Sequence, residues 1–582
     1  MKRRTVAAMV LALGLLMSCS RPDAAGNKAA IDVSTPVNGD WAVVRLEAEP
    51  DSLNPVIHTA SNASYAMYGA NNSQIFEFLL GYDPDNKWTL TKPLLAEGMP
   101  VVSDDHLTYT FVLRDGVKWH DGQPVTPEDV LFTFKATACP LTDAAPSRSY
   151  MSDIADIQIE GRSMKFLMKK PNSFNVINIG NTVPVMPKHV FDPEGLLDKL
   201  SYKDMLGPKG KDANAKKFAD AFNASPSNRA PIGTGPYKFE KWDTGRELVL
   251  VRNDNYWGTK PRLDKIVYRF ITDYTAALTA LKSGEIDAMP RMLPIQFAQQ
   301  TSGSEFERQF TKTKYSIPSV FYIMWNNERP FFKDKRVRQA MTMLLDRQKI
   351  VDTIRFGIGS LAVGPITPGN ADFNSDIKAW PYDPKRAAEL LDEAGWKDHD
   401  GDGIRDKDGV KFKFEFLGPN GSTLFPQLSP ILREELKKVG IEMTERVIEF
   451  NVMLESLKDH KYDASTLGTT SDLVVDPFQV WHSSSAVNRG SNYASFKNPE
   501  SDKLLEEARQ EFDLEKRKQI YWKWQEIIHE EQPYTYLYYG QEPAAYSNRF
   551  QGVQWIPPRP GYDLQSWWTP KPLQKYGKKP TP

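Results

Sequence analysis

The longest run of apolar residues in this chain lies close to its start. Residues 6–17 are almost wholly apolar, they follow a basic stretch at residues 2–4, and no run of 18 apolar residues comes after them. A helix that crosses a bilayer needs about 20 such residues, whereas a short apolar run behind basic residues is typical of a secretory signal peptide. We therefore predict a signal peptide at residues 1–18 and a remainder that folds in water.

The end of the signal peptide resembles the lipobox of bacterial lipoproteins. Leu16 lies three positions before Cys19, and the small Ser18 precedes the cysteine. The resemblance implies that Cys19 becomes a lipidated N-terminus whose acyl chains hold the protein on a membrane surface. The alternative is a plain signal peptide with an incidental cysteine. Residues 19–38 are rich in Ala, Asn, Ser, Pro and Asp, which predicts a flexible tether.

Length, charge and cysteine content narrow the class of the exported protein. Without its first 18 residues the 582-residue chain still far exceeds the ~250–300 residues at which one core stops growing, so we expect at least two lobes. The 73 basic and 74 acidic residues nearly cancel, which argues against nucleic acid as a partner. Cys139 is the only cysteine besides Cys19, so packing rather than an internal disulfide must stabilise the fold.

Strand and helix signals are interspersed along the chain without a fixed repeat. Residues 41–46 and 107–114 have the pattern of strands. Thr126 before Pro127 begins a predicted helix, since Thr caps a helix and Pro suits its first position. Three further predicted helices begin at aspartates and have apolar faces, which comprise Val337, Met341, Leu344, Leu345 and Val351; Ala387, Leu390, Leu391 and Ala394; and Leu514, Tyr521, Trp524 and Ile528. The pattern predicts a multi-lobed α/β protein.

Several blocks of sequence resemble the extracellular solute-binding proteins of family 5, the peptide and nickel receptors of ABC importers. The blocks follow one another in the order found in that family and extend over nearly all of the exported chain. They comprise residues 109–130 (YTFVLRDGVKWHDGQPVTPEDV); 231–237 (PIGTGPY), 253–257 (NDNYW) and 283–287 (SGEID); 332–340 (FKDKRVRQA) and 345–347 (LDR); 382–384 (YDP) and 390–396 (LLDEAGW); and 496–505 (FKNPESDKLL).

The resemblance implies a two-lobe periplasmic-binding-protein clamshell of the cluster C type, with a subdomain inserted into lobe I. Lobe I is expected at residues 39–62, 190–320 and 538–582, the inserted subdomain at 63–189 and lobe II at 321–537. The chain is expected to cross between the lobes near residues 322–325 and 534–539. Both stretches have strand character, as hinge crossings in such a fold do, although plain sheet core is an alternative interpretation for their aromatic residues.

The resemblance also implies a function, the capture of di- to oligopeptides and their delivery to an ABC permease. A peptide ammonium needs a carboxylate when the lobes close over it, because an unpaired buried charge is costly. In the peptide-binding members this carboxylate lies in lobe II, a few residues before an acid-proline pair, and the matching residue here is Asp472, before Asp476 and Pro477. The spacing departs from the usual one by one residue, so a solvated loop acid is the alternative for Asp472.

Six further residues are candidates for the ligand site. Gly235 and Tyr237 lie in a glycine-rich loop, where glycine allows close approach of the backbone to a ligand. Arg489 has the geometry to bind a peptide carboxylate through two hydrogen bonds, with a surface arginine as the alternative. Trp325, Asn326 and Trp481 are aromatic or polar candidates for the cleft, and each also has an interpretation as a core residue.

An acidic segment suggests a second kind of site. Asp398, Asp400, Asp402 and Asp406 alternate with other residues, and Gly403 is the sixth, as at the start of a calcium loop. Position twelve is Gly409 rather than Glu, so the bidentate ligand of an EF-hand is missing. We favour an acidic hairpin turn over a structural Ca²⁺ site and expect no other cofactor.

Other functions remain as alternatives. Nickel chelates, haem, opines or oligosaccharides are possible ligands of the same kind of receptor. An exported hydrolase belongs to a different class, but the sequence has no Gly-x-Ser-x-Gly and no His-Glu-x-x-His motif. We therefore expect a monomeric binding protein without enzymatic activity, anchored by its lipid on the periplasmic side of the envelope or at the cell surface.

Overall fold

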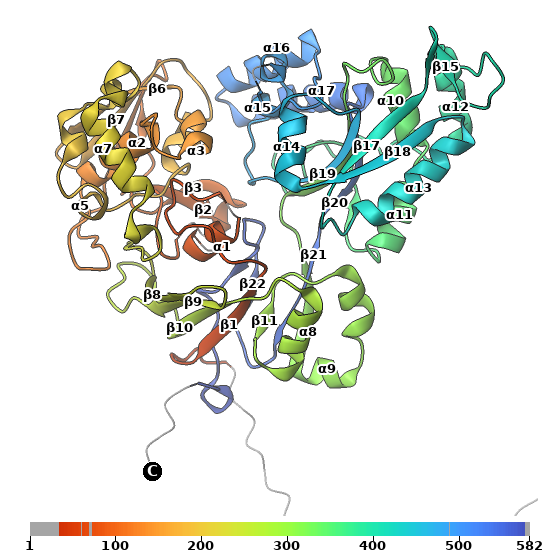
Figure 1. Cartoon of the computed structure of the whole chain (residues 1–582). Coiled ribbons are helices and arrows are strands. Elements are labelled where there is room, and N and C mark those ends of the chain that lie inside the picture. The colour runs from red at the N-terminus through yellow and green to blue at the C-terminus, as the bar shows by residue number, and fades with distance from the viewer. Residues whose placement is uncertain (1–33, 60, 69–72, 488, 577–582) are drawn as a thin grey trace, which may run out of the picture.

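The computed structural model describes residues 34–59, 61–68, 73–487 and 489–576. The predicted signal peptide at 1–18, Cys19 and most of the tether lie outside the described residues. The described chain forms two sheet-based lobes and a subdomain that lies beside one lobe and opposite the other (Figure 1). No helix within these ranges combines the length and the hydropathy that a bilayer span requires.

Lobe I is built on a seven-stranded sheet that draws on both ends of the chain. In sheet order the strands are β12 (Phe310–Tyr315), β21 (Glu542–Ser547), β11 (Ala288–Met289), β1 (Trp41–Leu46), β10 (Lys265–Phe270), β9 (Glu247–Arg252) and β8 (Tyr237–Asp243). Strand β1 spans the predicted residues and pairs in parallel with β10 and β11. It is buried over nearly its whole length, as expected for a central parallel strand with both faces covered. The helices of this lobe are α1 (Ser61–Tyr68), α8 (Tyr274–Ser283) and α9 (Ser304–Gln309).

The inserted subdomain has its own sheet and its own core. Its sheet has the strand order β4 (Val101–Val102), β5 (Thr108–Val112), β7 (Ser163–Met168) and β6 (Ile154–Glu160), and a separate hairpin joins β2 (Leu80–Asp83) to β3 (Thr89–Pro93). Its helices are α2 (Pro127–Ala138), α3 (Ala145–Tyr150), α4 (Asn175–Gly180), α5 (Lys188–Phe191), α6 (Tyr202–Met205) and α7 (Ala213–Asn223). Helix α2 begins where predicted, and the carboxylate of Asp129 accepts a hydrogen bond from the backbone N–H of Thr126 at 2.8 Å.

The limits of this subdomain differ from the expected range of 63–189. Phe218 and Phe222 of α7 pack into the core of the subdomain, so the subdomain extends well beyond residue 189. Conversely, Tyr65 of α1 and Phe76 belong to the core of lobe I. The packing of the apolar face of α7 sets the first boundary. This boundary was not predicted, because α7 follows a loop-rich stretch whose sequence gives little indication of the domain on which the chain packs.

Lobe II is built on a six-stranded sheet covered by helices. Its strand order is β14 (Ser360–Leu361), β20 (Tyr534–Tyr539), β13 (Ser319–Trp325), β19 (Ala464–Thr470), β17 (Lys413–Pro419) and β18 (Glu442–Ile448), and a small hairpin joins β15 (Asp406–Lys407) to β16 (Val410–Lys411). Its helices are α10 (Lys335–Met343), α11 (Arg347–Ile354), α12 (Pro384–Glu393), α13 (Phe425–Lys438), α14 (Phe450–Lys458), α15 (Phe478–Trp481), α16 (Pro499–Gln510) and α17 (Leu514–Glu531).

The chain passes between the two large sheets through very short connections. Residues 316–318 join β12 to β13, and residues 540–541 join β20 to β21. The aromatic strands expected to contain the crossings therefore lie wholly within the sheet of lobe II, and the crossings lie immediately beside them. Strands β20 and β21 continue one another from lobe II into lobe I (Figure 1).

Two details of the predicted helices are wrong. The helix expected from Asp334 to Val351 is divided into α10 and α11, because Asp346 caps a new helix by accepting a hydrogen bond from the backbone N–H of Lys349 at 2.9 Å. Leu514 was expected to face inward but is 62% exposed, since it is the first residue of α17 and lies beyond the surface that this helix buries.

Candidate functional site

A cavity of about 200 Å³ lies where the three parts of the molecule meet. Its walls are made by lobe I, by the inserted subdomain and by one residue of lobe II, Asp472. The lining residues are Pro55, His58, Ser64, Tyr65, Tyr68, Phe78, Tyr82, Ser147, Asn181, Thr182, Asp472 and Arg559. The phenolic rings and amide groups offer apolar surface and hydrogen-bonding partners together, a combination typical of small-molecule sites.

Asp472 contributes the carboxylate of this cavity and faces lobe I. Its Oδ1 lies 2.9 Å from Nη2 of Arg559, and the side chains of the two residues are 56% and 34% exposed. The attraction of Asp472 raises the pKa of the Arg559 guanidinium. Because Arg559 belongs to the C-terminal part of lobe I, the pair joins the two lobes across the cavity.

Both partners are placed by loops with defined anchors. Asp472 follows β19, where the backbone N–H of Ser471 donates to the carbonyl of Pro318 in a hinge connection at 2.8 Å. The next residue, Leu473, is buried against Tyr82 and Leu90 of the inserted subdomain. Its carbonyl accepts a hydrogen bond from Nδ2 of Asn370 at 2.8 Å.

Arg559 lies in the turn between the short strands β22 (Gln554–Trp555) and β23 (Tyr562–Asp563). Gly561 in this turn has φ +97°, and a Cβ at that position would lie 2.0 Å from the ring of Tyr315. Glycine is therefore required for the turn to fold against lobe I and to present Arg559 to the cavity.

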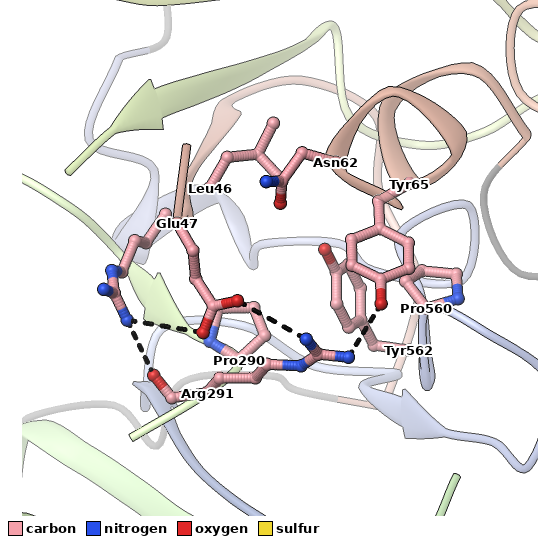
Figure 2. A pocket seen from close by; sticks show the side chains of 9 residues that line it. Leu46, Glu47, Asn62, Tyr65, Pro290, Arg291, Pro560 and Tyr562 are labelled. Carbon is pink, nitrogen blue, oxygen red and sulfur yellow. Dashed lines mark hydrogen bonds and ion pairs between the residues drawn. The ribbon is translucent and has the colours of Figure 1, made fainter. Parts of the chain in front are cut away.

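A polar cluster in lobe I borders the cavity and shares Tyr65 with it (Figure 2). Arg291 donates from Nη2 to the hydroxyl of Tyr65 at 2.7 Å, and its Nη1 lies 3.4 Å from Oε2 of Glu47. Arg45 is buried and donates to the carbonyl of Arg291 at 3.0 Å. The free space here is only about 20 Å³, room for about one water, so the cluster supports the wall and offers no ligand site of its own.

The inserted subdomain and lobe II also meet outside the cavity. The backbone N–H of Ser173 donates to the carbonyl of Arg509 at 2.7 Å. The rings of His106 and Phe512 stack with centroids 3.6 Å apart. Together with Asp472 and Arg559, these contacts show that the two lobes are closed upon each other in this conformation.

Trp481 lies in lobe II near the loop that carries Asp472. It lines a smaller cavity of about 90 Å³ on one face of the sheet, together with Tyr322, Tyr534 and Tyr536. Ser471 and Val475, on either side of Asp472, line this second cavity as well. Asp472 and Trp481 are thus the two predicted site residues that the structure brings into one region.

Four other candidates lie in the cores of the lobes. Tyr237 is completely buried in lobe I, where its hydroxyl is 3.4 Å from the carbonyl of Leu263. Trp325 is completely buried in lobe II, and its indole N–H donates to the hydroxyl of Thr535 at 3.1 Å. The amide of Asn326 donates to the carbonyl of Tyr462 at 2.8 Å. None of these three side chains lines either of the two cavities described.

Gly235 is the fourth of these buried candidates. A Cβ there would lie 2.3 Å from the carbonyl oxygen of Gln74, so the close approach that glycine permits is to the protein's own backbone. His120 of the inserted subdomain holds the same loop from the other side, with Nδ1 accepting from the N–H of Gly233 at 3.1 Å and Nε2 lying 3.0 Å from the carbonyl of Gly235.

Arg489 lies on the surface of lobe II. Its guanidinium pairs with Asp459 and with Glu455 of α14, all within that lobe. The side chain is about half exposed, and it is already engaged by two carboxylates, an arrangement that fits its alternative interpretation as a surface arginine.

The acidic segment of lobe II forms a hairpin turn with an internal cation. Asp398, Asp400 and Asp406 have carboxylate oxygens within 4.8 Å of one another. Nζ of Lys411 on β16 lies 2.5 Å from Oδ1 of Asp400 and 2.9 Å from Oδ1 of Asp402. These carboxylates raise the pKa of the Lys411 ammonium despite its partial desolvation. Binding of Ca²⁺, which stays a prediction, would have to displace this ammonium.

Sequence reasoning missed Arg559 and the tyrosines of the cavity wall. The run Pro558-Arg-Pro-Gly561 is a turn signal and could have indicated an exposed loop. Its position opposite Asp472 depends on how the C-terminal segment returns to lobe I, which no local pattern shows. Tyr65, Tyr68 and Tyr82 lie outside the sequence blocks that resemble family 5, so the resemblance did not indicate them.

Comparison with known proteins identifies the family. Residues 91–491 match the model of the bacterial extracellular solute-binding proteins, family 5. The chain belongs to this family. It is 30% identical to the oligopeptide-binding protein AppA of Bacillus subtilis over 98% of this chain and 100% of that protein. It is 26% identical to the dipeptide-binding protein of Escherichia coli over 87% of this chain and 90% of that protein.

Solved structures of family 5 members give the same result for the fold. The structure of AppA from Bacillus subtilis in complex with a nonapeptide aligns with a TM-score of 0.74 and 29% identity, covering 92% of this chain and 100% of that one. NikZ from Campylobacter jejuni in complex with Ni(L-His) aligns with a TM-score of 0.71 and 26% identity, covering 91% and 99%. The predicted two-lobe α/β fold of the family is thereby confirmed.

Proposed function

We propose that this protein captures short peptides between its two lobes and delivers them to the permease of an ABC importer. The observation that carries the proposal is the position of Asp472, an exposed carboxylate of lobe II at a cavity whose other walls belong to lobe I and the inserted subdomain. A peptide ammonium enclosed at this place would have the negative partner that a buried positive charge requires.

The lining of the cavity suits the constant parts of a peptide. Side-chain amides of Asn181 and hydroxyls of Ser64, Ser147 and Thr182 can pair with main-chain groups, directly or through water. Such pairing is independent of peptide sequence. The full-length similarity to an oligopeptide-binding protein supports the same class of ligand.

We further propose a lipid anchor at Cys19 and a location on the periplasmic side of the envelope. The sequence around Cys19 supports the anchor, and the membership of an extracellular family supports export. The protein would act as a monomer that binds and releases its ligand unchanged, since family 5 comprises binding proteins.

A chelated metal is a second candidate ligand, and one residue favours it. His58 lines the interlobe cavity, with Nε2 3.1 Å from the hydroxyl of Tyr68, and a metal chelate can be bound through a single imidazole. A nickel–histidine complex added to the purified protein distinguishes the two ligand classes. We expect it to leave the melting temperature unchanged while peptides raise it.

The direct test is to identify what the protein carries. Native mass spectrometry of gently purified protein should show a heterogeneous set of short peptides. A library of synthetic di- to nonapeptides should then raise the melting temperature, because a ligand that binds only the folded state stabilises it. If neither experiment detects a peptide, the proposed function is wrong.

The replacement Asp472→Ala tests the site. It should raise the Kd for peptides about 30-fold or more, equivalent to ~2 kcal/mol, because the enclosed ammonium loses its partner. Asp459→Ala is the matched control, since Asp459 is also an ion-paired carboxylate of lobe II but pairs within that lobe. Equal affinities of Asp472→Ala and the wild type would remove Asp472 from the site.

A further inference from the structure

The second cavity of lobe II has features that the interlobe cavity does not share. Its floor consists of Tyr322, Tyr534, Tyr536 and Trp481, all of them buried, and Val480 of α15 forms part of its rim. The rings of Tyr322 and Tyr534 stack with centroids 4.3 Å apart, and that of Trp481 lies 4.7 Å from the ring of Tyr534. The cavity is therefore a pocket with a closely packed aromatic floor, which we call the aromatic pocket.

One polar atom in this floor is unpaired. The hydroxyl of Tyr536 is buried, and it has no hydrogen-bond partner among the described residues. By contrast, the hydroxyl of Tyr322 is paired with Oγ1 of Thr469 at 2.8 Å. A buried hydroxyl without a partner is unfavourable for the free protein. Because this hydroxyl is inaccessible to solvent, Tyr536 can contact a ligand in the pocket only through its ring.

The pocket lies next to the proposed ammonium partner. Ser471 lines the aromatic pocket, and its neighbour Asp472 lines the interlobe cavity. Consecutive Cα atoms are 3.8 Å apart, and an extended peptide advances ~3.3 Å per residue. A peptide whose ammonium meets Asp472 can therefore place a side chain at the pocket within its first three residues.

The charge and the exposure of the rim residues favour entry of a ligand side chain from the side of Asp472. Thr469 at the rim is exposed, while Ser471, Val475 and Val480 are half-buried. Asp476, the acid of the rim, is neutralised by Arg509 at 2.6 Å. The opening thus presents apolar and neutral polar groups, which favours an uncharged side chain over a lysine or a glutamate.

We propose that this aromatic pocket of lobe II is a specificity subsite that takes a large apolar side chain from the N-terminal part of the peptide. Because the floor is aromatic and its unpaired hydroxyl is inaccessible, tyrosine, phenylalanine and leucine all rank above alanine. The inference rests on the proposed function and adds to it a selection among peptides.

The test uses the intact protein and trialanine peptides in which Tyr, Phe, Leu, Lys or Glu replaces each position in turn. At one of the three positions Tyr, Phe and Leu should lower the Kd about tenfold or more relative to Ala, the ratio expected when a large apolar side chain leaves water. Lys and Glu at that position should give no such gain.

Variants then locate the subsite. Val480→Trp fills the rim and should reduce the Tyr-to-Ala ratio of Kd values towards one, whereas Val452→Trp, on the exposed face of α14, should leave the ratio as in the wild type. Tyr536→Phe, which removes only an unpaired and inaccessible hydroxyl, should raise the melting temperature of the peptide-free protein and keep the wild-type ratio.

The outcomes separate the two proposals. If trialanine and its relatives fail to bind and the library of di- to nonapeptides fails as well, the proposed function fails together with the subsite. If the library binds and the trialanine series does not, the subsite for the first three residues is overturned. If they bind with Kd values that do not depend on the side chain at any position, or if Val480→Trp keeps the wild-type ratio, the subsite alone is overturned and peptide capture stands.

Discussion

His120 shows how one half-buried imidazole fixes a family motif in place. Its Nδ1 must accept a hydrogen bond from the N–H of Gly233, and its Nε2 faces the carbonyl of Gly235, so the neutral ring with the proton on Nε2 satisfies both partners. Burial lowers the pKa of His120 to about 4. Contacts within the protein thereby account for the glycines of this loop.

This low pKa predicts a pH dependence of stability. The unfolded state binds a proton at this residue below about pH 6.5, whereas the folded state binds it only below about 4, so unfolding takes up a proton between these values. The free energy of unfolding should therefore decrease as the pH falls from 6.5 to 4, by up to ~1.4 kcal/mol per pH unit. Urea denaturation at several pH values measures this free energy of unfolding.

The control for this prediction removes the titrating group. The difference in unfolding free energy between the wild type and His120→Gln should shrink as the pH falls through this window. His399→Asn, which removes an exposed histidine of lobe II, should follow the wild-type profile. Parallel profiles for the wild type and His120→Gln would show that His120 does not titrate as described.

Among the elements, β1 depends on a buried ion cluster at its start. Arg549 pairs with Asp40 and, at 2.7 Å, with Asp287 of the SGEID motif, and all three side chains are nearly or fully buried. Asp40 also accepts a hydrogen bond from the N–H of Tyr576 at 2.9 Å. The cluster joins the start of β1, the turn before β11 and the segment after β21 into one unit.

Replacement of Arg549 should therefore be strongly destabilising. Arg549→Met removes the only cation paired with Asp40 among the described residues and leaves Asp287 with Lys575 at 3.9 Å alone, and loss of a buried ionic partner typically costs about 3–5 kcal/mol of stability. Arg489→Met removes an arginine that pairs with two carboxylates at the surface, where the expected loss is below about 1 kcal/mol. Thermal and urea denaturation measure the loss of stability in each of the two variants. Losses of equal size in the two variants would contradict this account of the cluster.

The elements also show what the sequence could predict. Strand β1 and helices α2, α12 and α17 begin where caps and apolar spacing indicate, because those signals are local. The division between α10 and α11 was not predicted, because the apolar spacing continues past Asp346, which caps α11. Asp472 was predicted from a family motif. Arg559 could not be predicted, because its position depends on which loops meet in space. Trp325 and Tyr237 lie in the sheet cores, and no spacing rule distinguishes such a core position from a ligand site.

At the scale of the whole molecule, several contacts hold the lobes together away from the hinge, among them Phe174 of the inserted subdomain, which packs into the core of lobe II. The pair of Asp472 with Arg559 is one of them, and its side chains remain partly exposed. An ion pair of this kind contributes at most about 1 kcal/mol, enough to change the ratio of open to closed molecules about fivefold. Arg559 therefore pairs with Asp472 in the peptide-free protein, and a ligand ammonium must compete with it for this carboxylate.

Removal of this pair should open the empty receptor. Small-angle X-ray scattering of peptide-free Arg559→Gln should give a larger radius of gyration than the wild type, and the difference should diminish when peptide is added. Arg489→Gln is the control, because its carboxylate partners lie in its own lobe. A radius identical to that of the wild type in Arg559→Gln would show that the pair does not hold the lobes together.

The contact between Asp40 and Tyr576 has a practical consequence. Because Asp40 and Tyr576 are both held on lobe I, two fluorophores attached beside these residues would move as one body and keep a constant energy transfer. A biosensor for ligand capture needs one fluorophore inserted in a surface turn of lobe II, such as the hairpin between β15 and β16, where an added domain would swing with that lobe alone.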